Sequence, residues 1–108
     1  MKKWNDREFN TVEWVIKYIS PGSVEKKYRD DIRRLKEKPA VQHMYYSREE
    51  KAALCEAISY FEEFYKYSVN GMPKGNKTVA GVLERLEYLK SAREKLMAGG
   101  IPREGHRE

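Results

Sequence analysis

The spacing of hydrophobic and polar residues along the chain predicts an all-α protein with four helices. Apolar residues recur every three or four positions, as they do on one face of a helix, and no segment shows the sustained alternation of a strand. Breaks rich in Pro, Gly, Ser and Asn separate the periodic segments. The pattern predicts a single helical domain, residues 1–98, and a flexible tail, residues 99–108. Its helices are expected over about residues 6–20, 24–38, 48–69 and 79–98.

Two of the predicted helix starts carry complete capping signals. Asn5 precedes the first helix with Glu8 three residues later, and Ser47 precedes the third helix with Glu50 at the same spacing. In such a capping box the first side chain accepts a bond from the helix backbone, and the Glu accepts one from the capping residue. These pairs predict where the two helices begin, and Ser23 is expected to cap the second helix in a simpler way.

The third and fourth predicted helices have the widest apolar faces, so we expect them to form the core. A short loop joins them, which favours a compact four-helix domain built on their antiparallel hairpin. The face of the third helix consists of Leu54, Ala57, Ile58, Phe61, Phe64, Tyr65 and Ser68, flanked by Ala53, Tyr60 and Tyr67. The face of the fourth consists of Val79, Val82, Leu83, Leu86, Leu89, Leu96 and Met97. The linker at residues 39–46 is apolar enough to pack back across the helices, where it could form a groove wall.

Two aromatic residues stand apart from the apolar face of the first helix. Trp14 and Tyr18 lie one turn apart on its opposite side. They either pack between two neighbouring elements or form an exposed anchor for a partner, because Trp and Tyr are enriched among the residues that dominate interface energies. Trp14 and Tyr18 are therefore the candidate partner-binding residues.

Charge is unevenly distributed along the chain. Basic residues exceed acidic ones by 22 to 17, giving a net charge of +5, but residues 39–69 carry three basic and five acidic side chains. The basic side chains of the second helix could contact phosphates, although Asp30 and Asp31 interrupt them and no Asn or Gln there could read bases. A solvated charged face is the alternative interpretation. The candidate nucleic-acid-binding residues are Lys26, Lys27, Arg29, Arg33 and Arg34.

Residues for metal, nucleotide or nucleophilic chemistry do not come together in the sequence. His43 and His106 lie in a linker and in the tail, and the single cysteine, Cys55, is predicted to project from the third helix away from the core. Neither metal-ligand spacing nor a phosphate-binding glycine pattern is found. We therefore predict no catalytic, cofactor-binding or metal-binding residues, no cofactor and no enzymatic activity.

Together these features favour a small regulatory or adaptor protein that binds another macromolecule. A protein partner is expected, a homodimer stays open, and DNA or RNA binding through the second helix is the alternative function. The lone cysteine and the lack of a long apolar run or a signal-peptide pattern predict a cytoplasmic protein without a membrane partner. In general style, as a short, basic, helical chain with many Tyr and Lys residues, the sequence resembles accessory proteins of phages and mobile elements.

Overall fold

The computed structural model describes residues 3–73, 75 and 77–98, and in that part the only regular structure is helical. These described residues form four α-helices: α1 (Asp6–Tyr18), α2 (Arg29–Lys36), α3 (Arg48–Asn70) and α4 (Lys77–Ala98). Three short 3-10 turns join them: η1 (Pro21–Ser23), η2 (Lys26–Tyr28) and η3 (His43–Tyr45). The predicted all-α fold class is confirmed, whereas the predicted tail and His106 lie outside the described residues.

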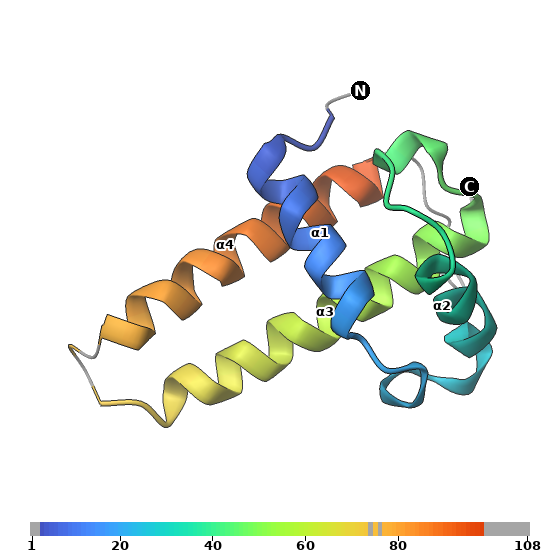
Figure 1. The fold of residues 1–108 in the computed structure, drawn as a ribbon. Helices are drawn as coiled ribbons and strands as arrows, with labels where there is room; N and C mark the ends of the chain where they lie inside the picture. Colours follow the sequence, from blue (N-terminus) through green and yellow to red (C-terminus); the bar gives the residue numbers. More distant parts are fainter. Residues whose placement is uncertain (1–2, 74, 76, 99–108) are drawn as a thin grey trace.

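The hairpin of α3 and α4 is the backbone of the fold (Figure 1). Helix α1 crosses one side of this hairpin and contacts both of its helices, while α2 lies against α3. Gly75 lies in the turn between α3 and α4 with a φ of 83°, a left-handed conformation that costs glycine little because it has no Cβ. Figure 1 shows that α1, α2 and the linker gather at one end of the hairpin, so the turn end projects beyond them.

Both predicted capping boxes are present. The side chain of Asn5 accepts a hydrogen bond from the backbone of Glu8 at 2.8 Å, and the Glu8 carboxylate accepts one from the Asn5 backbone at 2.8 Å. Ser47 and Glu50 form the same reciprocal pair, at 3.1 and 2.9 Å. Local sequence thus fixes the starts of α1 and α3, as predicted.

The second helix is shorter than its pattern predicts. It begins at Arg29 rather than near residue 24, and Ser23 does not cap it. Instead Ser23 belongs to η1, which starts with a proline and is capped by the Ser20 side chain. Val24 then runs in an extended conformation that buries its side chain in the core. The predicted start near residue 24 was wrong because Pro21 and the burial of Val24 favour a non-helical entry. The helix ends at Lys36, close to the predicted end.

The core lies at the end of the hairpin where the other elements gather, and we call this the packed end. Here Leu54, Ile58, Leu89 and Leu96 have no exposed surface. The linker does pack back, since His43 is fully buried with its ring 5.3 Å from that of Trp4 in an edge-on arrangement. Helices α3 and α4 also bury Ala53, Ala57, Phe61 and Ala92. Further buried apolar side chains come from α1, α2, the segments beside them and the linker: Val12, Val15, Ile16, Ile19, Val24, Ile32, Leu35 and Tyr46.

Beyond the packed end, the apolar faces of α3 and α4 continue but are not covered. No described residue between Glu62 and Leu89 is buried, and we call residues 63–73, 75 and 77–88 the free end. Phe64 is 54% exposed and Leu83 is 47% exposed, so their prediction as core residues was wrong. The physical reason is that α1 reaches only the near edge of this part, where Trp14 contacts Tyr65 and Arg85 and where Arg7 donates to the Tyr88 hydroxyl at 2.6 Å. The other elements gather at the packed end and leave Phe64 and Leu83 about half exposed (Figure 1).

Candidate docking surface

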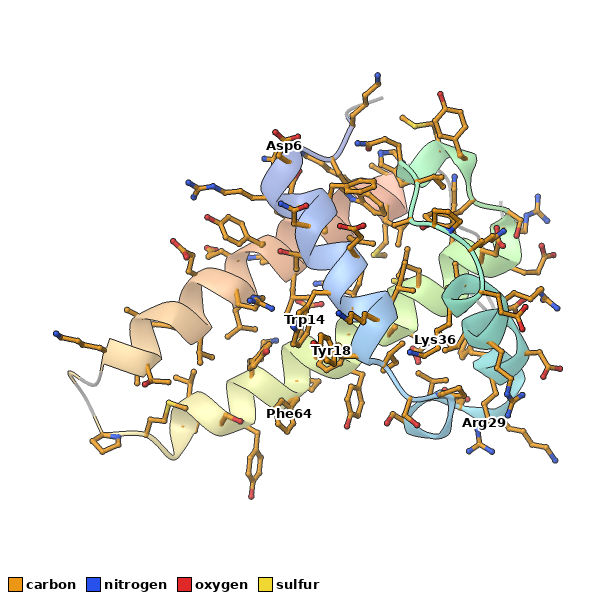
Figure 2. The ribbon with its side chains drawn as sticks, viewed as in Figure 1. Asp6, Trp14, Tyr18, Arg29, Lys36 and Phe64 are labelled. Atoms are coloured by element: carbon orange, nitrogen blue, oxygen red, sulfur yellow. The ribbon has the colours of Figure 1, made fainter. Side chains whose placement is uncertain are left out.

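Trp14 joins α1 to both helices of the hairpin. Its ring centroid lies 4.7 Å from that of Phe61 and 6.1 Å from that of Tyr65, both on α3. From α4, the Arg85 guanidinium lies 4.6 Å from the Trp14 ring centroid, within the range of a cation–π contact. Tyr18 lies on the outer side of Trp14, with ring centroids 5.3 Å apart. Trp14 is therefore half-buried and held from three sides, and Figure 2 shows Tyr18 beside it.

The aromatic contacts of Trp14 extend along α3 into rings that face solvent. Tyr65 lies 5.7 Å from Phe64, and Phe61 lies 5.2 Å from Tyr60, measured between ring centroids. The exposed fractions are 57% for Tyr18, 39% for Tyr60, 54% for Phe64 and 80% for Tyr67. We call this set the aromatic surface: Trp14, Tyr18, Tyr60, Phe64, Tyr65 and Tyr67.

A groove of about 540 Å³ lies between α3 and the segment that follows η1, and we call it the acidic groove. Its apolar lining is Val24, Tyr60, Phe64 and Tyr67. Its polar lining is Ser23, Glu25, Glu56, Ser59 and Glu63. Three carboxylates and no basic side chain therefore line a groove in a chain whose net charge is +5.

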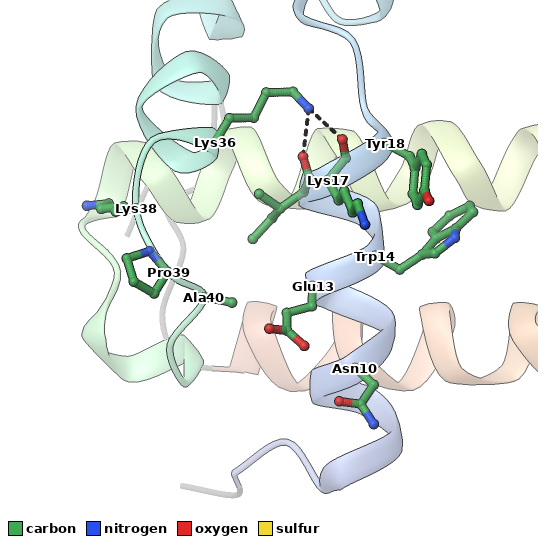
Figure 3. Close-up of a pocket in the computed structure, with 10 residues that line it drawn as sticks. Asn10, Glu13, Trp14, Lys17, Tyr18, Lys36, Lys38, Pro39 and Ala40 are labelled. Atoms are coloured by element: carbon green, nitrogen blue, oxygen red, sulfur yellow. Dashed lines mark hydrogen bonds between the residues drawn. The ribbon is translucent and has the colours of Figure 1, made fainter.

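A second groove, of about 640 Å³, is lined by residues of α1, Trp14 and Tyr18 among them, and by the end of α2 with the linker (Figure 3). Linker residues Pro39 and Ala40 line it, as the apolar linker suggested. Lys36 donates to the backbone carbonyls of Ile16 and Lys17 at 2.8 and 2.9 Å, and burial lowers its pKa. This lysine satisfies the last carbonyls of α1, which makes it a structural side chain rather than a free cation for a ligand.

The predicted basic residues of the second helix are partly neutralised by their own neighbours. Arg33 binds Asp30 at 2.8 Å, and Arg34 binds Asp31 in the same way one residue later. The Arg33–Asp30 pair is largely exposed, so it adds little stability, whereas Asp31 in the other pair is only 13% exposed. Both pairs reduce the positive charge that α2 presents. The other three candidates lie at or just before the start of α2: Lys26, Lys27 and Arg29.

Cys55 does not project away from the core as predicted. Its side chain packs partly buried against the core, and burial raises the pKa of its thiol. Nearby, Arg93 on α4 binds the buried carboxylate of Glu62 through two nitrogens, one of them at 3.2 Å. A thiol with a raised pKa is less reactive, so this arrangement is structural.

Neither a metal site nor a membrane-spanning helix is found among the described residues. No group of three or more His, Cys, Asp or Glu side chains there is placed to hold a metal ion. Among the helices described, none combines the length and the apolar character needed to cross a bilayer. The predicted absence of a cofactor and of enzymatic activity stays a prediction.

Comparison with known proteins gives no match to the chain, whether by protein family, by curated protein or by solved structure. Function is therefore inferred from the chain's own residues. Sequence reasoning found Trp14 and Tyr18 but missed Phe64 and Tyr67 as surface residues, because periodicity placed them in the core or at its edge. The available signal was the density of aromatic residues, five within residues 60–67, which is more than one buried stripe of a helix holds.

Proposed function

We propose that the protein is a small non-enzymatic regulatory or adaptor protein that binds a protein partner through the aromatic surface. The observation that carries this proposal is the exposure of four large aromatic rings beside the half-buried Trp14. Contiguous exposed apolar surface on a small domain marks interaction sites, and Trp and Tyr are enriched among interface hot spots.

The way these rings are held supports the same proposal. Phe61 and Arg85 fix the Trp14 ring in the free protein, so little side-chain freedom remains to be lost there on binding. Tyrosine adds a large apolar body and a hydroxyl tip with only two side-chain torsions, which suits it to protein interfaces. A second copy of the chain is one partner that the proposal allows.

The setting of this function is also part of the proposal. The single cysteine favours a reducing compartment, and we place the protein in the cytoplasm on that basis. An accessory role in a phage or mobile element is suggested by the general style of the sequence alone. DNA or RNA binding through α2 ranks second, because two of its arginines are paired with aspartates of the same helix.

Affinity capture from nuclease-treated lysate of the source cells tests the proposal. A double variant, Phe64→Ser with Tyr67→Ser, should lose a protein that the unchanged chain captures. The matched control is Val41→Ser with Tyr45→Ser, which removes two exposed apolar side chains outside the aromatic surface. Equal capture by both double variants, or capture only without nuclease treatment, would contradict binding of a protein through this surface.

A further inference from the structure

The lining of the acidic groove is suited to an apolar side chain. Tyr60, Phe64 and Tyr67 line it from α3, and Val24 lines it from the opposite segment. At about 540 Å³ the groove has a volume in the usual range of ligand sites. Since all three rings are at least 39% exposed, covering them would remove a large apolar area from water.

The charges around this groove select what can accompany that apolar side chain. Glu25, Glu56 and Glu63 line it without a basic side chain among the lining residues. Glu63 lies 3.5 Å from the Lys66 ammonium, but both side chains are mostly exposed, so this contact holds neither group firmly. The groove therefore favours a cation, and the faces of its tyrosine rings favour one as well.

The lining of the acidic groove indicates which kind of protein segment could bind there. This inference rests on the proposed function. We infer that the acidic groove binds a partner segment in which Lys or Arg side chains flank a large aliphatic side chain. A nucleic acid does not fit, because three carboxylates would face its phosphates. The basic helix α2 of a second copy fits poorly, because its apolar residues Ile32 and Leu35 are buried in its own core.

Peptide binding provides the test. The probe is a fluorescein-labelled amphipathic peptide of about 15 residues, built from Leu and Lys at helical spacing, and its matched partner has Glu in place of every Lys. We expect the Lys peptide to bind at least about tenfold more tightly in fluorescence anisotropy. The net charge of +5 alone predicts that the Glu peptide binds more tightly. Which peptide binds more tightly therefore shows whether the acidic groove or the overall charge of the protein controls binding.

A pair of triple variants localises the effect. Glu25→Gln, Glu56→Gln and Glu63→Gln together should weaken binding of the Lys peptide about tenfold. The control replaces exposed carboxylates elsewhere, Glu37, Glu87 and Glu94, with Gln and should change binding less than about twofold. Tighter binding of the Glu peptide, or equal losses in the two triple variants, would overturn the inference.

The captured partner separates this inference from the proposed function. Capture of the partner could require Phe64 and Tyr67 but be unchanged by the three Glu→Gln substitutions in the acidic groove. In that case the aromatic surface is a docking site, and the inference that the groove binds a basic segment is wrong. If capture is indifferent to Phe64 and Tyr67, the proposed function itself is wrong. Thermal melts of each variant, expected within a few degrees of the unchanged chain, confirm that losses reflect binding rather than unfolding.

Discussion

The two ends of the α3–α4 hairpin have similar apolar side chains but differ in how much of them they bury. At the packed end, Leu54 and Leu89 have no exposed surface. At the free end, Phe64 and Leu83 on the same two helices are each about half exposed. The difference lies in the number of layers, since α1, α2 and the linker gather at the packed end (Figure 1). Only the near edge of the free end is reached by α1, through the contacts of Trp14 with Tyr65 and Arg85.

Polar contacts differ between the ends in the same direction. At the packed end, the nearly buried carboxylate of Glu8 accepts hydrogen bonds from Lys95, Ser91 and the Asn5 backbone. At the free end, the ion pair of Glu63 and Lys66 is mostly in water. The packed end therefore holds the fold together, while the free end and the adjoining rings remain available for binding.

The sharpest test of this comparison uses two phenylalanines three residues apart on α3. Phe61→Ala should lower the free energy of unfolding by about 3–5 kcal/mol, as truncation of a buried aromatic side chain does. Phe64→Ala should lower it by less than about 1 kcal/mol, because that ring is 54% exposed. Urea denaturation measures both. Similar losses for the two variants would show that the free end is as well packed as the other.

A second test concerns the buried carboxylate of Glu8. Glu8→Ala should lower the free energy of unfolding by about 2–3 kcal/mol, because Lys95 and Ser91 lose a partner that is largely shielded from water. The matched substitution at the free end, Glu63→Ala, should cost less than about 0.5 kcal/mol. A loss at Glu63 as large as that at Glu8 would contradict the comparison.

The same carboxylate predicts a pH dependence. Burial alone would raise the pKa of Glu8, but hydrogen bonds from Lys95 and Ser91 outweigh it and lower the pKa below the ordinary 4.5. A group with a lowered pKa in the folded state stabilises it fully above the ordinary value and loses that effect as the pH falls. Unfolding free energies measured below about pH 4.5 should therefore fall less steeply in Glu8→Gln than in the unchanged chain.

A further test compares Trp14 and Tyr18, which lie where the packed end meets the free end. Trp14→Ala should lower the unfolding free energy by about 2 kcal/mol, since the ring is half-buried against Phe61 and Arg85. Tyr18→Ala should change it by less than about 0.5 kcal/mol, because its ring is mostly in water. Thermal melts of the single variants distinguish these outcomes, and a large loss at Tyr18 would assign it to the core.

The last test concerns the charged surface of the packed end. Reversal of Lys26, Arg29 and Arg33 to Glu should change the unfolding free energy by less than about 1 kcal/mol, because Lys26 and Arg33 are exposed and Arg29 makes only a long hydrogen bond, 3.4 Å, to the Val24 carbonyl. We expect the unchanged chain to bind duplex DNA weakly and without sequence preference. This binding should vanish near about 0.15 M salt, because salt weakens contacts between phosphates and a few basic side chains. Tight binding at that salt concentration, lost on reversal, would favour the nucleic-acid function instead.

Local signals in the sequence predicted much of the fold. The starts of α1 and α3 were predictable because a capping box requires only residues three positions apart, as at Asn5 and Ser47. The hairpin was predictable because both of its helices carry long apolar faces. The start of α2 was not, because Val24 leaves the helical conformation to reach a core made by distant segments.

The candidate docking surface was predictable only in part, because burial depends on neighbours that no local pattern specifies. Periodicity placed Phe64 on the apolar face of α3, but it could not show that α1 crosses the hairpin in a position that leaves Phe64 exposed. It placed Cys55 outside, yet at the packed end α1, α2 and α4 all contact α3, so burial extends beyond one stripe. Trp14 packs between elements, as the first interpretation of the first-helix pair requires, and Tyr18 faces solvent. The role of the pair as an anchor for a partner stays a prediction.

The positions of the two tryptophans give the chain a pair of intrinsic optical probes. Trp4 is 3% exposed, and its indole donates to the Ala92 carbonyl at 2.9 Å, so its emission should change only when the packed end unfolds. Trp14 borders the rings that a partner would cover, so its emission should shift when that surface is occupied. A Trp4→Phe chain would thus turn ultraviolet fluorescence into a label-free signal of docking, and a Trp14→Phe chain into a signal of folding.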